Sequence, residues 1–372
     1  MIYNNVLGII FANADEEALS EITGIRSIGS VPFGGGYRLI DFTLSNMVNA
    51  GVTKVGIITN NNYQSLMDHL GAGKPWDLSR RNEGLFLLPP FNSDAVRNYN
   101  AGRIGALKNA AHFLEKSNEE YALLSDCSYV ANIDFTRLFE EHEKNDADVT
   151  VLYKHGCVPH FSEQPVIEKT ENGRIRKLSF ADEKEKNADY MIKAMLIKKS
   201  LLESSVNELH SKGFCSFEKD FIFKNINKLN IRAFEVPGFC EPIDSLKSYF
   251  EANFALLKPE NFKQLFACGR PVYTKSYDDM PAVYGLGCEV KNSLVADGCI
   301  IEGEVENSII FRGCRIEKDA VVKNSIVMPH AFIAQNAMLN YCITDKNVAI
   351  RNGKALSGAD SYPVYIGKNI HI

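Results

Sequence analysis

A short repeat in the last part of this 372-residue chain constrains its fold more than any other feature. Asn-Ser-Leu at 292–294 recurs as Asn-Ser-Ile at 307–309 and 324–326, and Asn340 then precedes Tyr-Cys-Ile. The copies are spaced by 15, 17 and 16 residues, with β-branched and other apolar residues between them in short steps. Three short strands with three tight turns take roughly 18 residues, so the spacing predicts the hexapeptide repeat of a parallel β-helix.

Turn residues are expected six positions after each repeated asparagine, at Gly298, Gly313, His330 and Lys346. A short solenoid has exposed end strands, which must be capped or joined to another chain. Residues 361–372 are expected to supply such a cap or a strand. Some β-helices of this kind are acyltransferases that use a histidine between subunits, and His330 is the candidate for that role. Its position in a turn favours a surface residue, and the repeat then serves assembly and regulation.

The first 150 residues alternate strand and helix signals. Continuous apolar runs, typical of strands buried on both faces, are separated by segments with helical periodicity. Strands are predicted at 6–12, 54–60, 120–126 and 147–153, and helices at 39–51, 63–71, 106–116 and 135–146. This order predicts an α/β domain with a mostly parallel sheet and helices on both faces. Ligands of such sheets bind beyond the carboxyl ends of the strands, here the segment after Ala12 and the region of Asp126.

The middle of the chain continues in a mixed style. An Asn-Gly turn within 166–180 predicts a hairpin, and 245–258 has helical spacing. Residues 259–285 lack clear periodicity and contain three prolines. We therefore divide the chain into a first domain (1–258), a connection (259–285) and a β-helix domain (286–372).

The composition excludes several classes of protein. The net charge of −5 argues against a general nucleic-acid or membrane-surface binder. The nine cysteines are odd in number and lack CxxC pairs, so neither a disulfide framework nor a zinc site is indicated. No run approaches the roughly 18 apolar residues of a membrane span. We expect a cytoplasmic protein.

Four segments are similar to one known family. They are VPFGGGYRLIDFTLSNMVN (31–49), PWDL (75–78), LLPPF (87–91) and YCITDKNVAI (341–350). Together they resemble glucose-1-phosphate adenylyltransferase, also called ADP-glucose pyrophosphorylase, over nearly the whole chain and in the same domain order. The resemblance implies a nucleotidyltransferase-like, Rossmann-like domain followed by a left-handed β-helix, and assembly into tetramers.

The reaction of that family joins ATP and glucose 1-phosphate to give ADP-glucose and pyrophosphate. Its chemistry is positioning and charge neutralisation by Mg²⁺ and basic residues around crowded phosphates. A Gly-rich loop after the first strand must present backbone N–H groups to phosphate. Two carboxylates must hold the metal ion.

The phosphate loop does not meet these demands. The family pattern is approximately GGxGxRL, whereas this chain has Asn13, Ala14, Asp15, Glu16, Glu17, Ala18 and Leu19. Side chains now stand where glycines allow close approach of the backbone. Each carboxylate would also repel a phosphate by about 1 kcal/mol at ~4 Å even in bulk water.

Other positions of the family site are also altered. Two lysines of the family pattern fall on Ile28 and Gly36. The stretch facing the nucleotide becomes Ala-Gly-Arg-Ile-Gly at 101–105. The first metal carboxylate survives as Asp126, but Pro242 takes the place of the second. Two further acidic residues, Glu241 and Asp244, would replace it only with a shift of register, and Lys193 falls where a small glycine is expected beside the sugar.

These losses together predict a chain without functional catalytic residues, metal site or cofactor. Within the family it resembles the GlgD-type subunit, which pairs with a catalytic GlgC-type subunit. The resemblance implies a regulatory subunit of ADP-glucose synthesis in glycogen formation, in a heterotetramer with the catalytic chain. Two alternatives stay open: an active adenylyltransferase with a rebuilt site, and a scaffold or acyltransferase that acts through the β-helix.

Anion-binding residues remain outside the altered site. Arg26 and Arg38 flank the VPFGG segment, a region that contributes to an allosteric anion site in the family. Arg312 and Arg315 lie in the second coil of the repeat. We expect these four arginines to be candidate ligands of a phosphate-bearing effector.

Overall fold

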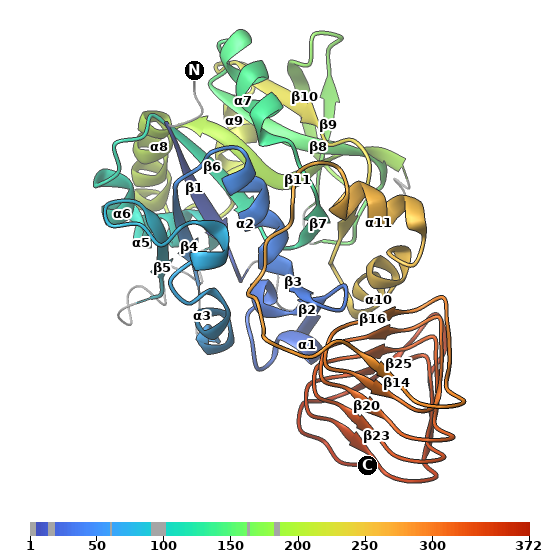
Figure 1. Ribbon diagram of the computed structural model, residues 1–372. Helices are drawn as coiled ribbons and strands as arrows, with labels where there is room; N and C mark the ends of the chain where they lie inside the picture. Colours follow the sequence, from blue (N-terminus) through green and yellow to red (C-terminus); the bar gives the residue numbers. More distant parts are fainter. Residues whose placement is uncertain (1–4, 14–18, 60–61, 91–101, 162–163, 182–186) are drawn as a thin grey trace.

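The chain folds into an N-terminal α/β domain and a C-terminal β-helix that stands against one end of it (Figure 1). The computed structural model describes residues 5–13, 19–59, 62–90, 102–161, 164–181 and 187–372.

The N-terminal domain is built on a mixed sheet, nine-stranded within the described residues. Its main path, in spatial order, is β10 (Ile175–Phe180), β9 (Pro165–Lys169), β11 (Asn187–Lys198), β6 (Tyr121–Asp126), β1 (Val6–Phe11), β4 (Lys54–Ile58) and β5 (Gly84–Leu88). Off this path, β8 (Val149–Cys157) pairs with β11 and β12 (Ile231–Glu235). The strands β6, β1 and β4 are parallel, as predicted, and β5, which was not predicted, is parallel to β4. Strand β11 runs antiparallel to β6, β8 and β9.

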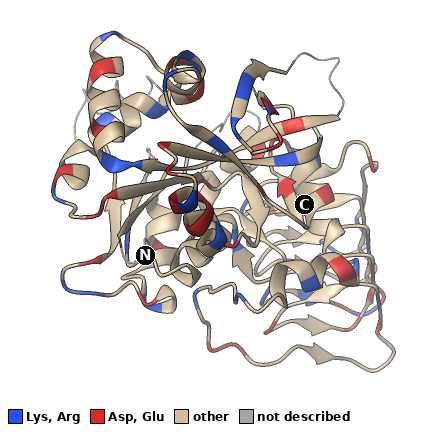
Figure 2. Cartoon of the chain, turned by 90° about the horizontal axis from the view of Figure 1, so that it is seen from above, with Lys and Arg blue, Asp and Glu red and all other residues tan. Residues whose placement is uncertain are grey.

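Helices pack on both faces of the sheet, which confirms the predicted α/β order. They are α2 (Leu39–Asn49), α3 (Gln64–Leu70), α5 (Gly102–Asn109), α6 (Ala111–Glu115), α7 (Phe135–Lys144), α8 (Lys199–Ser211) and α10 (Leu246–Ala255). Apolar side chains of successive strand residues point to opposite faces, so two core clusters form. Leu7 and Ile9 belong to one cluster and Val6 and Ile10 to the other. Charged residues of both signs are interspersed over the chain (Figure 2).

The connection contains a helix that its sequence did not indicate. Helix α11 (Pro259–Phe266) begins within the segment 259–285, with Pro259 in the first turn, where its missing N–H removes no hydrogen bond. Phe266 stacks on Tyr37 with ring centroids 4.9 Å apart. The helix is therefore held by tertiary packing on the N-terminal domain.

The C-terminal part is a left-handed parallel β-helix of three sheets, five-stranded within the described residues. The first sheet comprises β14 (Val283–Tyr284), β17 (Ile300–Ile301), β20 (Arg315–Ile316), β23 (Phe332–Ile333) and β26 (Ala349–Ile350). The second comprises β15 (Glu289–Lys291), β18 (Glu304–Glu306), β21 (Val321–Lys323), β24 (Met338–Asn340) and β27 (Ala355–Ser357). The third comprises β16 (Leu294–Val295), β19 (Ile309–Ile310), β22 (Ile326–Val327), β25 (Cys342–Thr344) and β28 (Val364–Ile366). The first coil starts at Val283, three residues before the predicted boundary at 286.

Stacked amides join the coils at the repeated asparagines. The Asn292 side-chain amide donates to the Asn307 oxygen over 2.7 Å, and Asn324 donates to Asn340 over 3.0 Å. Asn292 and Asn324 have positive φ, a conformation that asparagine tolerates.

The register of the fourth coil differs from the predicted one by a single residue. Lys323 pairs with Asn340, so Tyr341, with φ 51°, occupies the position that asparagine holds in earlier coils. The left-handed turn residue is consequently Asn347, with φ 58°, and not Lys346. Asparagine adopts this conformation more readily than lysine, so the turn chemistry accounts for the shift.

The C-terminal tail closes the last coil, as predicted. Strand β28 completes the third sheet, and Ile372 N–H donates to the Ala349 carbonyl over 3.0 Å. Arg351 N–H donates in turn to the Ile372 carbonyl over 2.9 Å. The edge of the first sheet is therefore paired at this end.

The third sheet packs on the N-terminal domain, and one ion pair crosses the contact. The Arg26 guanidinium donates to both carboxylate oxygens of Asp345, over 2.8 and 2.6 Å. Arg26 is 2% exposed and Asp345 is fully buried. The Tyr365 hydroxyl donates to Asp345 over 2.6 Å, so the carboxylate is well satisfied. A buried, hydrogen-bonded pair of this geometry fixes how the two domains meet.

Removal of one partner of this pair is expected to be strongly destabilising. Asp345→Ala leaves the Arg26 charge buried and unpaired, and should lower the free energy of unfolding by about 3–5 kcal/mol. The matched control, Arg315→Ala, truncates an exposed arginine of the β-helix and should change it by no more than about 0.5 kcal/mol. Urea unfolding followed by circular dichroism measures both; equal effects would contradict the structural role of the pair.

Candidate functional site

The carboxylate predicted to survive from the family site stands at the end of a central strand. Asp126 is the last residue of β6, pairs in register with Phe11 of β1 and is 3% exposed. The segment that follows β1 is the predicted degenerate phosphate loop. Of its positions, Asn13 is described and buried, whereas Ala14, Asp15, Glu16 and Ala18 lie outside the described residues.

The Asp126 carboxylate forms an ion pair with an arginine of the same chain. Arg103, in the first turn of α5, donates to Asp126 Oδ1 over 2.6 Å and also forms an ion pair with Glu218. Its guanidinium lies 4.5 Å from the centre of the Phe11 ring and donates to the Lys193 carbonyl over 3.2 Å. The guanidinium is therefore held from four sides.

Local backbone geometry places this arginine. Gly102 has φ 73°, and a Cβ atom there would come within 2.6 Å of the Cys215 carbonyl oxygen. Only glycine permits this approach, which brings Arg103 toward β6. The structure thus gives a role to Gly102 and Arg103, at positions where the sequence indicated only a loss.

The three charged groups stabilise each other in a desolvated site. Burial raises the pKa of Asp126 to about 7, although the Arg103 charge opposes the rise. Burial also disfavours the Glu218 carboxylate, but Arg103 outweighs it and holds its pKa below the ordinary value. Burial would lower the pKa of Arg103, yet the two acids keep it above the ordinary value. Arg103 is therefore a permanent cation at this site.

The residues around Asp126 do not fit a magnesium ion. Mg²⁺ takes oxygen ligands in a near-octahedral arrangement, one or two of them from carboxylates. Asp126 Oδ1 is already bound by the Arg103 cation, and Oδ2 is buried beside it. Pro242, which takes the second carboxylate position, pairs with Tyr129 in a two-stranded ladder of β13 (Cys240–Pro242) and β7 (Tyr129–Ala131). Asp244 accepts hydrogen bonds from His160 N–H and Ser245 Oγ. Within the described residues, no group of three or more His, Cys, Asp or Glu is arranged to hold a metal ion.

Further altered positions also lie in structural settings. Ile28 is fully buried and belongs to the core of the N-terminal domain. Lys193 lies with its ammonium 4.4 Å from the centre of the Phe161 ring, and burial lowers its pKa to about 8. Gly36 lines a different site, a pocket between the two domains.

This interdomain pocket gathers basic side chains. Its volume is about 240 Å³, and Arg38, Arg312, His330, Lys346 and Lys368 line it. Arg38 comes from the N-terminal domain, whereas the other four come from the β-helix. No Asp or Glu is among the described residues that line it.

Like charges in this pocket destabilise one another. Burial, together with the charges of Arg38 and Arg26, lowers the pKa of Lys346 to about 7. Burial and the Arg312 charge lower the pKa of His330. Arg312 lies against the Tyr277 ring and 3.5 Å from Asp279, and so is partly compensated. An anion in the pocket would relieve this repulsion.

The four predicted anion ligands separate into three settings. Arg38 and Arg312 line the pocket. Arg26 is bound in the buried ion pair with Asp345, so its guanidinium does not reach a ligand in the pocket. Arg315 is 52% exposed, pairs with Glu317 at 3.5 Å and does not line the pocket.

Two lysines that line the pocket, Lys346 and Lys368, were not predicted as anion ligands. The sequence did hold a signal that could have identified Lys346 as a pocket residue, namely the asparagine that follows it. Once Asn347 is taken as the turn residue, Lys346 is free to point away from the turn.

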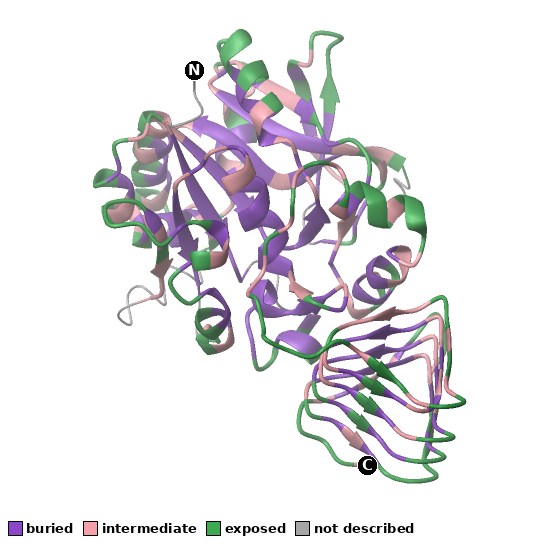
Figure 3. Cartoon of the chain, in the orientation of Figure 1, coloured by how far each residue is buried: buried purple, intermediate pink, exposed green. Residues whose placement is uncertain are grey.

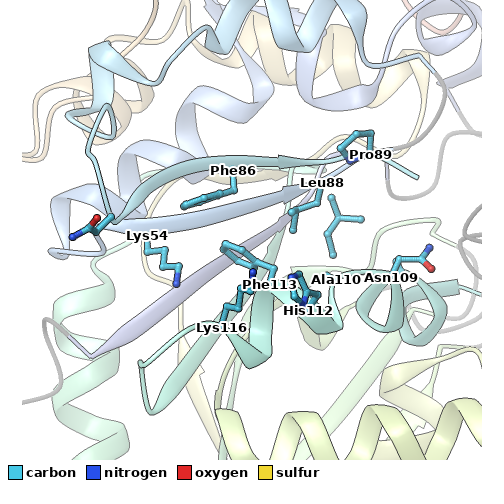
Figure 4. A pocket seen from close by; sticks show the side chains of 12 residues that line it. Lys54, Phe86, Leu88, Pro89, Asn109, Ala110, His112, Phe113 and Lys116 are labelled. Atoms are coloured by element: carbon cyan, nitrogen blue, oxygen red, sulfur yellow. The ribbon is translucent and has the colours of Figure 1, made fainter. Parts of the chain in front are cut away.

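A larger, apolar pocket lies at the free edge of the sheet, between β5 and helices α5 and α6 (Figure 4). It has a volume of about 440 Å³, and Phe86, Leu88 and Phe113 form much of its wall. Lys54 and Lys116 also line it. Asp126 is not among its lining residues, so it is separate from the altered family site.

Comparison with known proteins places the chain in a family. Residues 8–231 match the family model described as nucleotidyl transferase, and residues 283–361 match the GlmU-like, C-terminal hexapeptide model. A protein of Bacillus subtilis named glycogen biosynthesis protein GlgD is 32% identical over 371 residues, covering 100% of this chain and 98% of the relative. The chain belongs to the glucose-1-phosphate adenylyltransferase family.

Other members of this family show both types of chain. The glycogen biosynthesis protein GlgD of Geobacillus stearothermophilus is 36% identical over 86% of this chain and 83% of its own length. A glucose-1-phosphate adenylyltransferase of Bacillus cytotoxicus is 29% identical over 95% of this chain and 94% of its own length. Among the described parts of the chain, no helix is long and apolar enough to cross a membrane.

The ion pairs of Arg103 predict a pH-dependent loss of stability. Arg103→Ala removes the guanidinium that pairs with Asp126 and Glu218, both buried, and so raises the pKa of each carboxyl group. Acids with raised pKa in the folded state lose stability as pH rises, so the cost should reach about 3–5 kcal/mol at pH 8 and be smaller at pH 5, where Asp126 is protonated.

Urea unfolding at the two pH values measures this difference. Arg80→Ala is the matched control, because the Arg80 side chain is 41% exposed and should contribute little at either pH. A cost for Arg103→Ala that is equal at pH 5 and pH 8 would contradict the assigned ion pairs.

Proposed function

We propose that this chain is a non-catalytic regulatory subunit of glucose-1-phosphate adenylyltransferase in glycogen biosynthesis. It assembles with a catalytic family member, in a heterotetramer, and changes the rate or substrate affinity of that partner. The names of the two GlgD relatives support a role in glycogen biosynthesis, and the altered site supports the proposal that the chain is not catalytic.

One observation carries this proposal: the Arg103 guanidinium binds Asp126 where the family reaction requires a metal ion. Magnesium would have to displace a buried cation that is also bound to Glu218. A buried arginine does not release its proton, so Arg103 stays charged, and paired with the two carboxylates, at every working pH. Positioning of ATP by a metal ion on this carboxylate is therefore blocked.

The interdomain pocket supports a regulatory ligand for this subunit. Six described His, Lys and Arg residues from both domains line this pocket, and no Asp or Glu is among its described lining residues. A phosphate-bearing small molecule would neutralise Arg38 and Lys346 together and thereby link the two domains. Such a ligand binds more tightly to one domain arrangement than to others, which is the requirement for allosteric control.

Activity measurements test the catalytic part of the proposal. The chain alone, supplied with ATP, Mg²⁺ and glucose 1-phosphate, should release no pyrophosphate above background. Addition to a catalytic family member should change kcat or the apparent KM of the mixture. Turnover by the chain alone that is lost in Asp126→Asn would instead favour an active enzyme with a rebuilt site.

Anion binding should depend on pH through Lys346. Its pKa near 7 makes it mostly protonated at pH 6.5 and mostly neutral at pH 8.5, so sulfate should bind more tightly at pH 6.5. Isothermal titration calorimetry measures the affinity, and sulfate itself does not titrate in this range.

Two lysine variants distinguish the effect of Lys346 in the pocket from the loss of one positive charge anywhere on the surface. Lys346→Met should weaken sulfate binding and remove its pH dependence, whereas Lys354→Met, at an exposed position outside the pocket, should do neither. A pH dependence that persists in Lys346→Met would disprove the role of this lysine.

A further inference from the structure

The pocket between β5 and helices α5 and α6, which we call the edge pocket, has a polar end and an apolar end. Strands β4 and β5 are parallel there, with Lys54 beside Gly84 and Ile58 beside Leu88. Strand residues that are an even number of positions apart share a face, and Lys54 and Ile58 both line the pocket. They lie roughly 13 Å apart along the strand, so the pocket runs from a charged residue to an aliphatic one.

The space exists because the surrounding elements are small or end at this point. Helix α5 and the start of α6 contribute Ala106 and Ala110, whose side chains end at Cβ. Strand β5 is the last strand on this side of the sheet within the described residues, and it is less buried than its neighbour β4 (Figure 3). The volume of about 440 Å³ lies within the range of roughly 300–1,000 Å³ that is typical of small-molecule sites.

Aromatic side chains form the middle of the pocket wall. Phe86 of β5 and Phe113 of α6 contact each other, with ring centroids 5.2 Å apart. Phe113 packs directly on β4, because a Cβ atom at Gly56 would come within 2.5 Å of its ring. Phe86 stays 36% exposed, so part of this apolar wall faces water. A ligand with an apolar body would cover that surface, which favours binding.

The polar end holds a buried cation whose hydrogen bonding is incomplete. Lys54 is 9% exposed, and Glu119 is the one carboxylate within 4.0 Å of its ammonium among the described residues. This distance is too long for a hydrogen bond, and Glu119 Oε2 has no hydrogen-bond partner in the part of the chain that the structure describes. A buried ammonium without an acceptor is costly, so an acceptor on a ligand would stabilise it.

The charges at this end are complementary to one anion. Lys116, directly after α6, also lines the pocket, and Figure 4 shows its side chain toward the same end as Lys54, with Pro89 toward the other. Two ammonium groups beside the single carboxylate of Glu119 leave one positive charge. His112 is a further lining residue, and no Asp or Glu is among the described residues that line the pocket.

We propose that the edge pocket binds a small carboxylate with an apolar body. The ligand carboxylate accepts hydrogen bonds from the ammonium groups of Lys54 and Lys116, and its body lies along Phe86, Leu88 and Ile58. A neutral ligand leaves the positive charge of the polar end unmet, and a cationic ligand is repelled by it. No described residue lines both this pocket and the interdomain pocket, so the inference is independent of the proposed function.

Isothermal titration calorimetry of the full chain with octanoate at pH 7.5 tests the ligand class. The comparators, 1-octanol and octylammonium, have the same chain length with a neutral or a positive head. Octanoate should bind about ten-fold more tightly than 1-octanol, because hydrogen bonds between two charged groups are stronger than those to a neutral hydroxyl. Octylammonium should bind most weakly. Octanoate that binds no more tightly than either comparator overturns the inference.

Three variants locate the binding site. Lys116→Met removes an exposed charge and should weaken octanoate binding about ten-fold while leaving 1-octanol binding unchanged. Ala110→Leu fills the pocket and should weaken the binding of both ligands. The matched control, Lys144→Met, removes an exposed lysine at the end of α7, outside the pocket, and should bind both like the wild type.

Thermal unfolding followed by circular dichroism checks that each variant is folded. Lys116 and Lys144 are both exposed, so this pair of variants decides the question even if Ala110→Leu does not fold. Wild-type affinity for octanoate in Lys116→Met would mean that octanoate binds elsewhere on the protein, and the inference would then be wrong. An equal loss of affinity in Lys144→Met would show an effect of overall charge and would overturn it as well.

Discussion

The buried pair of Arg26 and Asp345 determines how the two halves of this protein meet. Neither group is stable alone in an apolar contact, since an isolated buried charge loses its hydration without compensation. One guanidinium nitrogen of Arg26 contacts both carboxylate oxygens, and the Tyr365 hydroxyl donates to one of them, so the carboxylate is satisfied and the β-helix has one well-defined position on the N-terminal domain. Lys346 follows Asp345 directly in the chain, so the same contact also places the Lys346 ammonium at the interdomain pocket.

The same physical rule operates at the altered nucleotide site with a different outcome. A carboxylate at a buried strand end needs a cation, and in the family reaction a metal ion meets that need. Here Arg103 meets it from within the chain and is itself held by Glu218 and the Phe11 ring. The Asp126 carboxylate thereby has a counter-ion from within the chain. The pocket between the domains is lined by several basic side chains, whereas the charge of Arg103 is met by the carboxylates of Asp126 and Glu218.

The sequence predicted the architecture well because its signals are local. Apolar runs, helical periodicity and the Asn-Ser repeats each reflect contacts within a strand, a helix or neighbouring coils. Helix α11 was missed because it depends on the stacking of Phe266 on Tyr37, residues more than 200 positions apart. The one-residue shift at Asn347 was missed because two neighbouring residues competed for one turn, and backbone conformation decided between them.

By itself the sequence determined the order of the domains, the repeat and the family, and it predicted the loss of the second metal carboxylate at Pro242. Residue identity and spacing along the chain are sufficient to recognise these features. Only the tertiary structure decided which charges meet. Of the four arginines predicted to bind an anion, one is buried in the interdomain ion pair, two line the pocket and one is exposed on the β-helix. Arg103 is the counter-ion of Asp126. Charge pairing depends on distance and burial, and both arise from folding rather than from position along the chain.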